Sequence, residues 1–242
     1  MFRRRKKDVP DDVEGLEDEA VEIEQDEVPA VPARPQGPWD VDDVPDDDQV
    51  QRIDLGGLRV PVPPGLEVRV DVNAESEVVA ATLVHQGSSM QINVFAAPKR
   101  SGIWDEVRAE IAASLVGGGG RAQDVEGPYG AELFAAVPLQ GGGAAPARFI
   151  GVDGPRWFVR ALLTGPAAQD RSVAAPLEQA LRSVVVVRGS EAMAVREPLP
   201  LHLPREVAEQ AAAAAAATDR GADEQTPDLT MPERGPEITE VR

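Results

Sequence analysis

Two short apolar runs separated by a turn sequence give the clearest folding pattern in the chain. Residues 149–152 and 157–163 flank Asp153-Gly154. Asp-Gly between two strand-like runs is a strong hairpin signal, because glycine accepts the positive φ that a tight turn requires. Three of the nine aromatic residues lie in this stretch. The pattern therefore predicts a hairpin at the centre of a sheet, with its turn at Asp153-Gly154.

Alternating apolar and polar residues predict further strands. Residues 59–65 form a short strand closed by a turn, with prolines that mark a sheet edge, and three alternating valines follow at Val68, Val70 and Val72. Residues 78–85 and 90–95 form a second predicted hairpin. The remaining predicted strands are residues 131–137 and 184–187, and residues 198–204 form an extended segment that is apolar enough to pack on the domain.

Two segments have the periodicity of helices. In the first, four apolar residues recur at four-residue steps: Ile103, Val107, Ile111 and Leu115. Acidic residues favour its N-terminal end, and the glycines at 117–120 end it and form a flexible loop. The second is predicted at about residues 175–183, with Pro176 in its first turn. Hairpins dominate and helices are few, so we predict an α+β fold, a single domain in which two main helices pack on an antiparallel β-sheet.

Charge divides the chain into three parts. The net charge is −18, yet residues 51–204 carry only −2 of it. We therefore predict a globular α+β domain at residues 51–204 between two acidic tails. Residues 1–50 are expected to be a disordered tail, basic and then acidic, with a proline-rich linker and Trp39 as an anchor. Residues 205–242 are expected to form an alanine-rich helix and a disordered acidic tail.

The N-terminal tail allows alternative interpretations. Residues 8–28 are either a solvated tail or a helix that folds on a partner, since apolar residues at 13, 16, 20 and 23 share one helical face. Prolines at every third position from Pro29 to Pro38 suit a stiff polyproline II rod, which we interpret as a spacer rather than a docking peptide. Trp39 is a natural anchor, and we prefer its docking on this chain's own domain to docking on another protein.

Candidate chemistry is sparse. The chain has no cysteine and two histidines, His85 and His202, and neither lies beside a nucleophile elbow. The glycines at 117–120 follow a helix and lack the Lys-Ser/Thr of a phosphate loop. Six acids between Asp40 and Asp48 lack the central glycine and closing glutamate of a calcium loop. We predict no catalytic, cofactor-binding or metal-binding residue, and no cofactor.

The location and the basic N-terminus follow from composition. The lack of cysteine fits a reducing compartment, and no apolar run is long enough to span a membrane, so we expect a cytoplasmic protein. Arg3–Lys7 carry five positive charges that could contact nucleic-acid phosphates, or could associate with the acids at residues 8–50, whose net charge is −16. Contact with nucleic acid is the less favoured interpretation.

Four long segments resemble a known family. They are residues 37–45 (G-P-W-D-V-D-D-V-P), 52–66 (R-I-D-L-G-G-L-R-V-P-V-P-P-G-L), 90–104 (M-Q-I-N-V-F-A-A-P-K-R-S-G-I-W) and 156–168 (R-W-F-V-R-A-L-L-T-G-P-A-A). They resemble an uncharacterised actinobacterial family, the domain-of-unknown-function family numbered thirty-seven ten, which implies a cytoplasmic protein without established cofactor or catalytic residues. The order of the elements also resembles the Mog1/PsbP-like fold, whose members are mostly non-enzymatic binding or assembly factors.

Three hypotheses for function follow. The leading one is a non-enzymatic protein-binding or adaptor domain with an unidentified protein partner. The alternative is a small-ligand-binding or enzymatic domain with a pocket near the 148–163 hairpin, in which Arg156, Trp157 and Arg160 are the residues to test. The third is a nucleic-acid-associated factor that works through Arg3–Lys7.

Overall fold

The computed structural model describes residues 36–75, 77–204 and 207–209. Within this part, a seven-stranded antiparallel sheet has the order β4-β5-β6-β10-β9-β8-β7. Its strands are β4 (Glu67–Val72), β5 (Val78–His85), β6 (Ser88–Ala96), β7 (Arg121–Gly127), β8 (Gly130–Pro138), β9 (Ala144–Gly154) and β10 (Trp157–Thr164). Because β10 is the middle strand, the prediction that this hairpin lies at the centre of the sheet is confirmed.

A smaller, four-stranded sheet has the order β1-β11-β3-β2. Its strands are β1 (Trp39–Asp40), β2 (Arg52–Asp54), β3 (Leu58–Pro61) and β11 (Val185–Val186). Strands β1 and β11 pair in parallel, and the other pairs are antiparallel. The sequence patterns did not predict this sheet as a separate unit. Strand β3 has a neighbour on both sides, but Pro61 at its end pairs only with Arg52 of β2, and Pro63 and Pro64 follow the strand.

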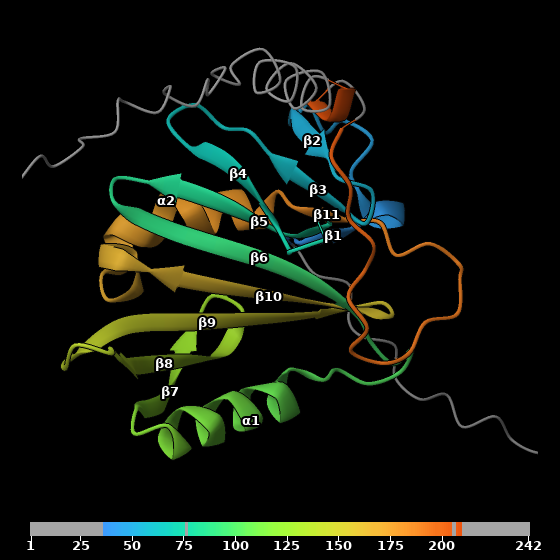
Figure 1. The fold of residues 1–242 in the computed structure, drawn as a ribbon. Helices are drawn as coiled ribbons and strands as arrows, with labels where there is room; N and C mark the ends of the chain where they lie inside the picture. The colour runs from blue at the N-terminus through green and yellow to red at the C-terminus, as the bar shows by residue number, and fades with distance from the viewer. Residues whose placement is uncertain (1–35, 76, 205–206, 210–242) are drawn as a thin grey trace, which may run out of the picture.

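The named helices are α1 (Trp104–Gly117), α2 (Arg171–Arg182) and the 3-10 helices η1 (Val41–Asp43) and η2 (Gly165–Ala168), and residues 207–209 are also helical. Figure 1 shows α1 beside β7 and β8, at the opposite end of the large sheet from β4. The predicted α+β class, with antiparallel sheet and two main helices, is confirmed. The basic block at 3–7, the segment 8–28, Pro29, Pro32 and Pro35, and the alanine run lie outside the described residues.

The main core lies on one face of the large sheet. Inward side chains of β6, β9 and β10, such as Ile92, Ile150 and Val159, are fully or almost fully buried there. Leu177 of α2 and Leu58 of β3 belong to the same cluster, so α2 and the small sheet cover the same face. The extended segment after β11 also packs on the domain, as predicted, since Leu199 is 3% exposed and its amide donates to the carbonyl of Val94.

The opposite face carries a smaller aromatic cluster. Trp104 at the start of α1 stacks on Phe158 with ring centroids 5.9 Å apart, and Phe158 stacks on Phe95 at 6.1 Å. Helix α1 contacts β7, β8 and β9. It therefore covers one end of this face, and its residues Val107 and Ile111 remain only half-buried.

Two glycines of β9 make room for two tryptophans on opposite faces. A Cβ at Gly151 would lie 2.0 Å from Cδ2 of Trp104, and a Cβ at Gly154 would lie 2.1 Å from Cε2 of Trp157. Each indole N–H is satisfied. Trp104 Nε1 donates to the carbonyl of Ala131 at 2.6 Å. Trp157 Nε1 donates to Oδ2 of Asp40 at 2.7 Å, which joins β10 to the residue that ends β1.

The predicted turn at Asp153-Gly154 is wrong by two residues. Both residues belong to β9 and pair with Phe158 and Trp157, while Pro155 and Arg156 form the turn. Proline presets φ for the first central position, and Arg156 takes a φ of 60° at the second. The Asp153 carboxylate instead accepts hydrogen bonds from the amides of Ile103 at 2.8 Å and Trp104 at 3.3 Å. It caps the N-terminus of α1, whose own N-cap residue, Ile103, has no side-chain acceptor.

The bounds of other elements also differ from the predicted ones, for physical reasons. Helix α2 begins at Arg171, because Asp170 accepts a hydrogen bond from the amide of Ser172 and caps it. Pro176 therefore lies inside the helix and not in its first turn. Strand β7 was not predicted, since most of its side chains are exposed and polar. In the second hairpin, β5 has the predicted bounds, and Gln86 and Gly87 form its turn with φ of 47° and 75°.

We expect Gly151→Ala to destabilise the protein by about 1–3 kcal/mol, because the new methyl group overlaps the Trp104 ring. Gly117→Ala is the matched control: this glycine is the last residue of α1, and a Cβ there meets open space. The control should be neutral or stabilise by about 0.5 kcal/mol. Urea unfolding measures both. Equal effects of the two changes would contradict the close Trp104 contact.

We expect Asp153→Ala to lower the free energy of unfolding by about 0.5–2 kcal/mol, since two amides at the start of α1 lose their acceptor. Asp47→Ala removes an exposed carboxylate with no hydrogen bond or ion pair to the described residues, and should leave stability unchanged. Hydrogen exchange of the α1 amides should become faster only in Asp153→Ala. Unchanged protection there would show that the cap contributes nothing.

Candidate functional site

The three residues proposed for a pocket at the central hairpin do not come together. Trp157 is 1% exposed and belongs to the main core. Arg160 lies on the opposite face of β10, because residues three apart in a strand point to opposite sides. Arg156 lies in the turn, and its guanidinium donates to the carbonyl of Gly189. The proposed site with all three residues is therefore not formed.

The acids at residues 40–48 have structural contacts. Asp40 accepts from the amide of Asp42 as well as from Trp157. Asp48 pairs with Arg52 at 2.6 Å, and the amide of Val50, helped by Arg52, holds the pKa of Asp48 below its usual value. Within the described residues, no group of three His, Cys, Asp or Glu side chains could hold a metal ion.

Each histidine side chain contacts a backbone carbonyl. His85 Nδ1 lies 3.0 Å from the carbonyl of Gly65. His202 Nδ1 lies 3.3 Å from the carbonyl of Leu203, and its ring contacts the backbone at Gly56. The contact of His85 joins the end of β5 to the turn before β4, in accord with its interpretation as a structural residue.

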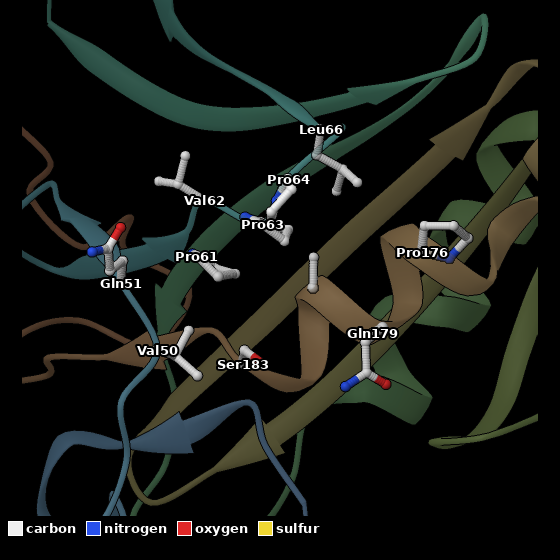
Figure 2. Close-up of a pocket in the computed structure, with 11 residues that line it drawn as sticks. Val50, Gln51, Pro61, Val62, Pro63, Pro64, Leu66, Pro176, Gln179 and Ser183 are labelled. Atoms are coloured by element: carbon white, nitrogen blue, oxygen red, sulfur yellow. The ribbon is translucent and has the colours of Figure 1, made fainter.

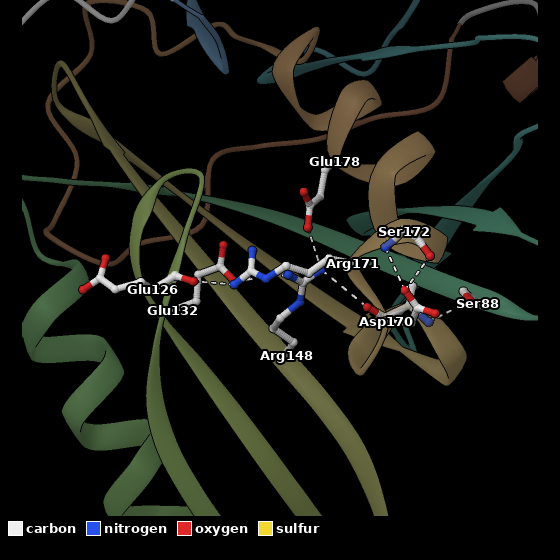
Figure 3. A network of polar contacts seen from close by, with 9 residues as sticks. Ser88, Glu126, Glu132, Arg148, Asp170, Arg171, Ser172 and Glu178 are labelled. Carbon is white, nitrogen blue, oxygen red and sulfur yellow. Dashed lines mark hydrogen bonds and ion pairs between the residues drawn. The ribbon is translucent and has the colours of Figure 1, made fainter.

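A buried ionic network connects α2 to the large sheet (Figure 3). Arg148 of β9 lies 3.3 Å from Glu132 of β8 and 2.6 Å from Glu178 of α2. It also donates to the carbonyl of Ala167 at 3.4 Å. Arg171, at the start of α2, lies 3.5 Å from Glu132. Sequence reasoning missed this network, although Glu132 and Arg148 occupy inward positions of strands, where a charged residue is a usable signal.

Burial dominates the electrostatics of this network. Glu132 is fully buried, and the loss of water raises its pKa despite the nearby charges of Arg148 and Arg171. Its Oε1 accepts no hydrogen bond from the described residues and lies against Gly127, where a Cβ would be 1.7 Å away. Removing Arg148 would leave Glu132 and Glu178 as buried carboxylates without their shared cation, so the network fixes α2 in one position.

An apolar hollow of about 490 Å³ lies beside α2. We call it the proline groove, and Figure 2 shows the residues that line it: Val50, Gln51, Pro61, Val62, Pro63, Pro64, Leu66, Pro176, Gln179, Ala180 and Ser183. They come from the segment before β2, the end of β3 and its connection to β4, and α2 with its C-cap Ser183. Val50 and Val62 are 43% and 42% exposed, so apolar surface is open to solvent there.

The walls of the proline groove are rigid. Four of the lining residues are prolines, whose rings fix φ. Pro176 reaches the groove because it lies inside α2, which Asp170 caps one turn earlier than predicted. The groove therefore has its shape before any partner arrives, which lowers the entropic cost of binding.

A second hollow, of about 540 Å³, is lined by charged as well as apolar residues. Asp40, Asp42 and Asp43 line it together with Arg156 and Arg188. The two arginines already have backbone acceptors, since Arg188 donates to the carbonyl of Arg156 at 3.1 Å and Arg156 donates to Gly189. These charges therefore hold the loop after β11 against the turn of the central hairpin.

A comparison with known protein families gives a match over the folded part of the chain. A family model described as "Protein of unknown function (DUF3710)" matches residues 37–210. The chain belongs to this family. The DUF3710 match includes every strand and helix from β1 to β11, so both sheets, the proline groove and the second hollow lie within it. It confirms the family that the four sequence segments indicate.

Comparisons with curated proteins and with solved structures give no further assignment. No curated protein matches the chain. Among solved structures, the chain is similar to the solution structure of cyanobacterial PsbP (CyanoP) from Synechocystis sp. PCC 6803, with 13% sequence identity and a TM-score of 0.36. That similarity covers 57% of this chain and 92% of that chain. In the described part, no helix combines the length and the apolar character needed to cross a membrane.

We expect Glu132→Gln to be more stable than the wild type near neutral pH. Because burial raises the pKa of Glu132, the folded state binds its proton more tightly than the unfolded state. The stability that this group contributes therefore falls as pH rises from its unfolded pKa, near 4.5, through the raised folded value. Glutamine cannot ionise and avoids this loss.

Urea unfolding of both proteins between about pH 4 and pH 7 measures the effect. The advantage of Glu132→Gln should shrink towards pH 4, where the wild-type carboxyl is protonated as well. Taking the difference between the two proteins cancels the titration of the other groups. An advantage that grows as pH falls would contradict the raised pKa.

Proposed function

We propose that this DUF3710 domain is a non-enzymatic protein-binding or adaptor domain that binds its partner through the proline groove. The observation that carries the proposal is the preformed apolar hollow of about 490 Å³ beside α2, with Val50 and Val62 open to solvent. A hollow of this kind suits one or two apolar side chains of a partner, which supply most of the binding energy in many interfaces.

The rim of the groove also suits a protein partner. Gln51, Gln179 and Ser183 lie among the apolar lining residues. Protein interfaces commonly combine an apolar centre with polar groups that hydrogen-bond at the rim. Among the described residues, Asp40, Asp153 and Glu178 have structural contacts that account for their positions, which favours a binding role over catalysis.

The acidic segment before the domain adds an electrostatic contribution to the proposed partner binding. Residues 8–50 carry a net charge of −16. Such a segment would speed the encounter with a basic partner, and salt would weaken this effect. The proposal places the protein in the cytoplasm, on the basis of its composition without cysteine.

We expect Val62→Glu to abolish partner capture, because it places a charge in the apolar centre of the groove. Val79→Glu is the matched control, since Val79 has the same 42% exposure but lies on β5, outside the groove lining. Full-length proteins would be used to capture partners from native cell extract, with mass spectrometry to identify them. A partner retained by the wild type and Val79→Glu, but lost by Val62→Glu, is the expected result.

Affinity measurements with the purified partner then make the test quantitative. A central apolar contact corresponds to a loss of at least about thirtyfold in affinity. Circular dichroism and thermal unfolding check that both variants are folded. The proposal fails if the wild type retains no partner, or if Val62→Glu retains the same partner with unchanged affinity.

A further inference from the structure

A third hollow lies between α1 and the outer face of the large sheet, on the side opposite α2. Its volume is about 210 Å³. Phe95 and Phe158 belong to the sheet, and Ile103, Val107 and Ile111 come from the start and the inner side of α1. Arg160 of β10 also lines it. We call this hollow the α1 pocket.

Arg160 is a partly buried cation without an acidic partner in the described part of the chain. Its Nη2 donates to Oδ1 of Asn93 at 3.2 Å, and its guanidinium lies 5.5 Å from the centre of the Phe95 ring. Its buried Nε has no acceptor among the described residues. Burial lowers the pKa of Arg160, and no neighbouring carboxylate offsets that effect.

The other arginines near the core are paired differently. Arg148 has two buried carboxylates, Glu132 and Glu178. Arg196, at the rim of the α1 pocket, binds Glu110 with both Nη atoms and lies 3.1 Å from Glu106. The acidic side chains of α1 at this rim are therefore occupied by Arg196, and Arg160 is left with unused donor capacity beside an apolar hollow.

We propose that the α1 pocket binds a small carboxylic acid. The carboxylate would accept hydrogen bonds from Arg160, and the apolar body would lie against Phe95, Phe158 and Ile111. Planar guanidinium matches carboxylate geometry, and a partly desolvated charge gains most from such a partner. An ion with several negative charges fits less well, because Arg160 is the one unpaired cation among the described lining residues and Glu110 lies at the rim.

The volume of the α1 pocket limits the size of the ligand. Typical small-molecule sites have about 300–1,000 Å³, so a hollow of 210 Å³ suits a single ring or a short chain. Ligands of that size bind with micromolar to millimolar dissociation constants. This site lies across the sheet from the proline groove, so the inference does not depend on the proposed function.

The test is a titration of the full-length protein with phenylacetate, benzoate and hexanoate, and with the three corresponding amides. The indole N–H signal of Trp104 reports on the pocket, because its ring stacks on Phe158. Trp39, in β1 of the other sheet, is the internal reference. The acids should shift the Trp104 signal alone and bind at least about tenfold more tightly than the amides.

Three variants locate the site. Arg160→Met should remove the preference for acids over amides. Arg69→Met is the matched control, because Arg69 lies on β4 of the same sheet, pairs with Glu67 at 2.8 Å and does not line the pocket. Ile111→Glu places a carboxylate in the pocket from the half-buried side of α1, and should weaken acid binding even if Arg160→Met is poorly folded.

The proposal is overturned by equal affinity for acids and amides, by an acid preference that survives in folded Arg160→Met, by unchanged acid binding of Ile111→Glu, or by no Trp104 shift at the highest soluble concentrations. Peptides ending in phenylalanine, with free and with amidated C-termini, form a further arm. If only the free peptide binds, the pocket recognises a protein terminus, and the small-acid proposal is wrong.

Discussion

The close approach of two indole rings to the backbone of β9 is the constraint on which the rest of the fold depends. Gly151 leaves room for Trp104 on one face, and Gly154 leaves room for Trp157 on the other. Trp104 is the first residue of α1, and Trp157 hydrogen-bonds Asp40 at the end of β1. One strand therefore positions α1 on one side of the large sheet and the start of the small sheet on the other.

The two faces of the sheet solve different packing problems. On the α2 face, burial is nearly complete, and the charges that enter it are held by the network around Arg148. On the α1 face, the helix covers only one end of the sheet, and Val107 and Ile111 stay half-buried beside Arg160. Apolar surface therefore remains accessible at the α1 pocket on this face, and on the α2 side it remains exposed at Val50 and Val62 of the proline groove.

Short-range sequence patterns predicted the two central hairpins and the first helix. The hairpins β5–β6 and β9–β10 and the helix α1 follow from alternation, turn residues and four-residue spacing. The turn after β9 was misplaced, because Asp153 and Gly154 have other structural roles. Asp153 caps α1, and Gly154 leaves room for Trp157. The small sheet pairs very short segments from both ends of the domain, such as β1 with β11, and no local pattern predicts such a pairing.

The candidate sites depend on the face of the sheet on which each side chain lies and on its partners in space. The sequence alone does not show those partners. Arg156, Trp157 and Arg160 are close in sequence, yet they lie in a turn, in the core and on the opposite face. Arg148, Arg160 and Arg196 differ in their partners: Arg148 and Arg196 have carboxylates, whereas Arg160 has an amide and an aromatic ring. Packing explains an arginine that is paired with acids. The partial burial of Arg160 without a carboxylate has a desolvation cost, and an anionic ligand in the proposed pocket would reduce that cost.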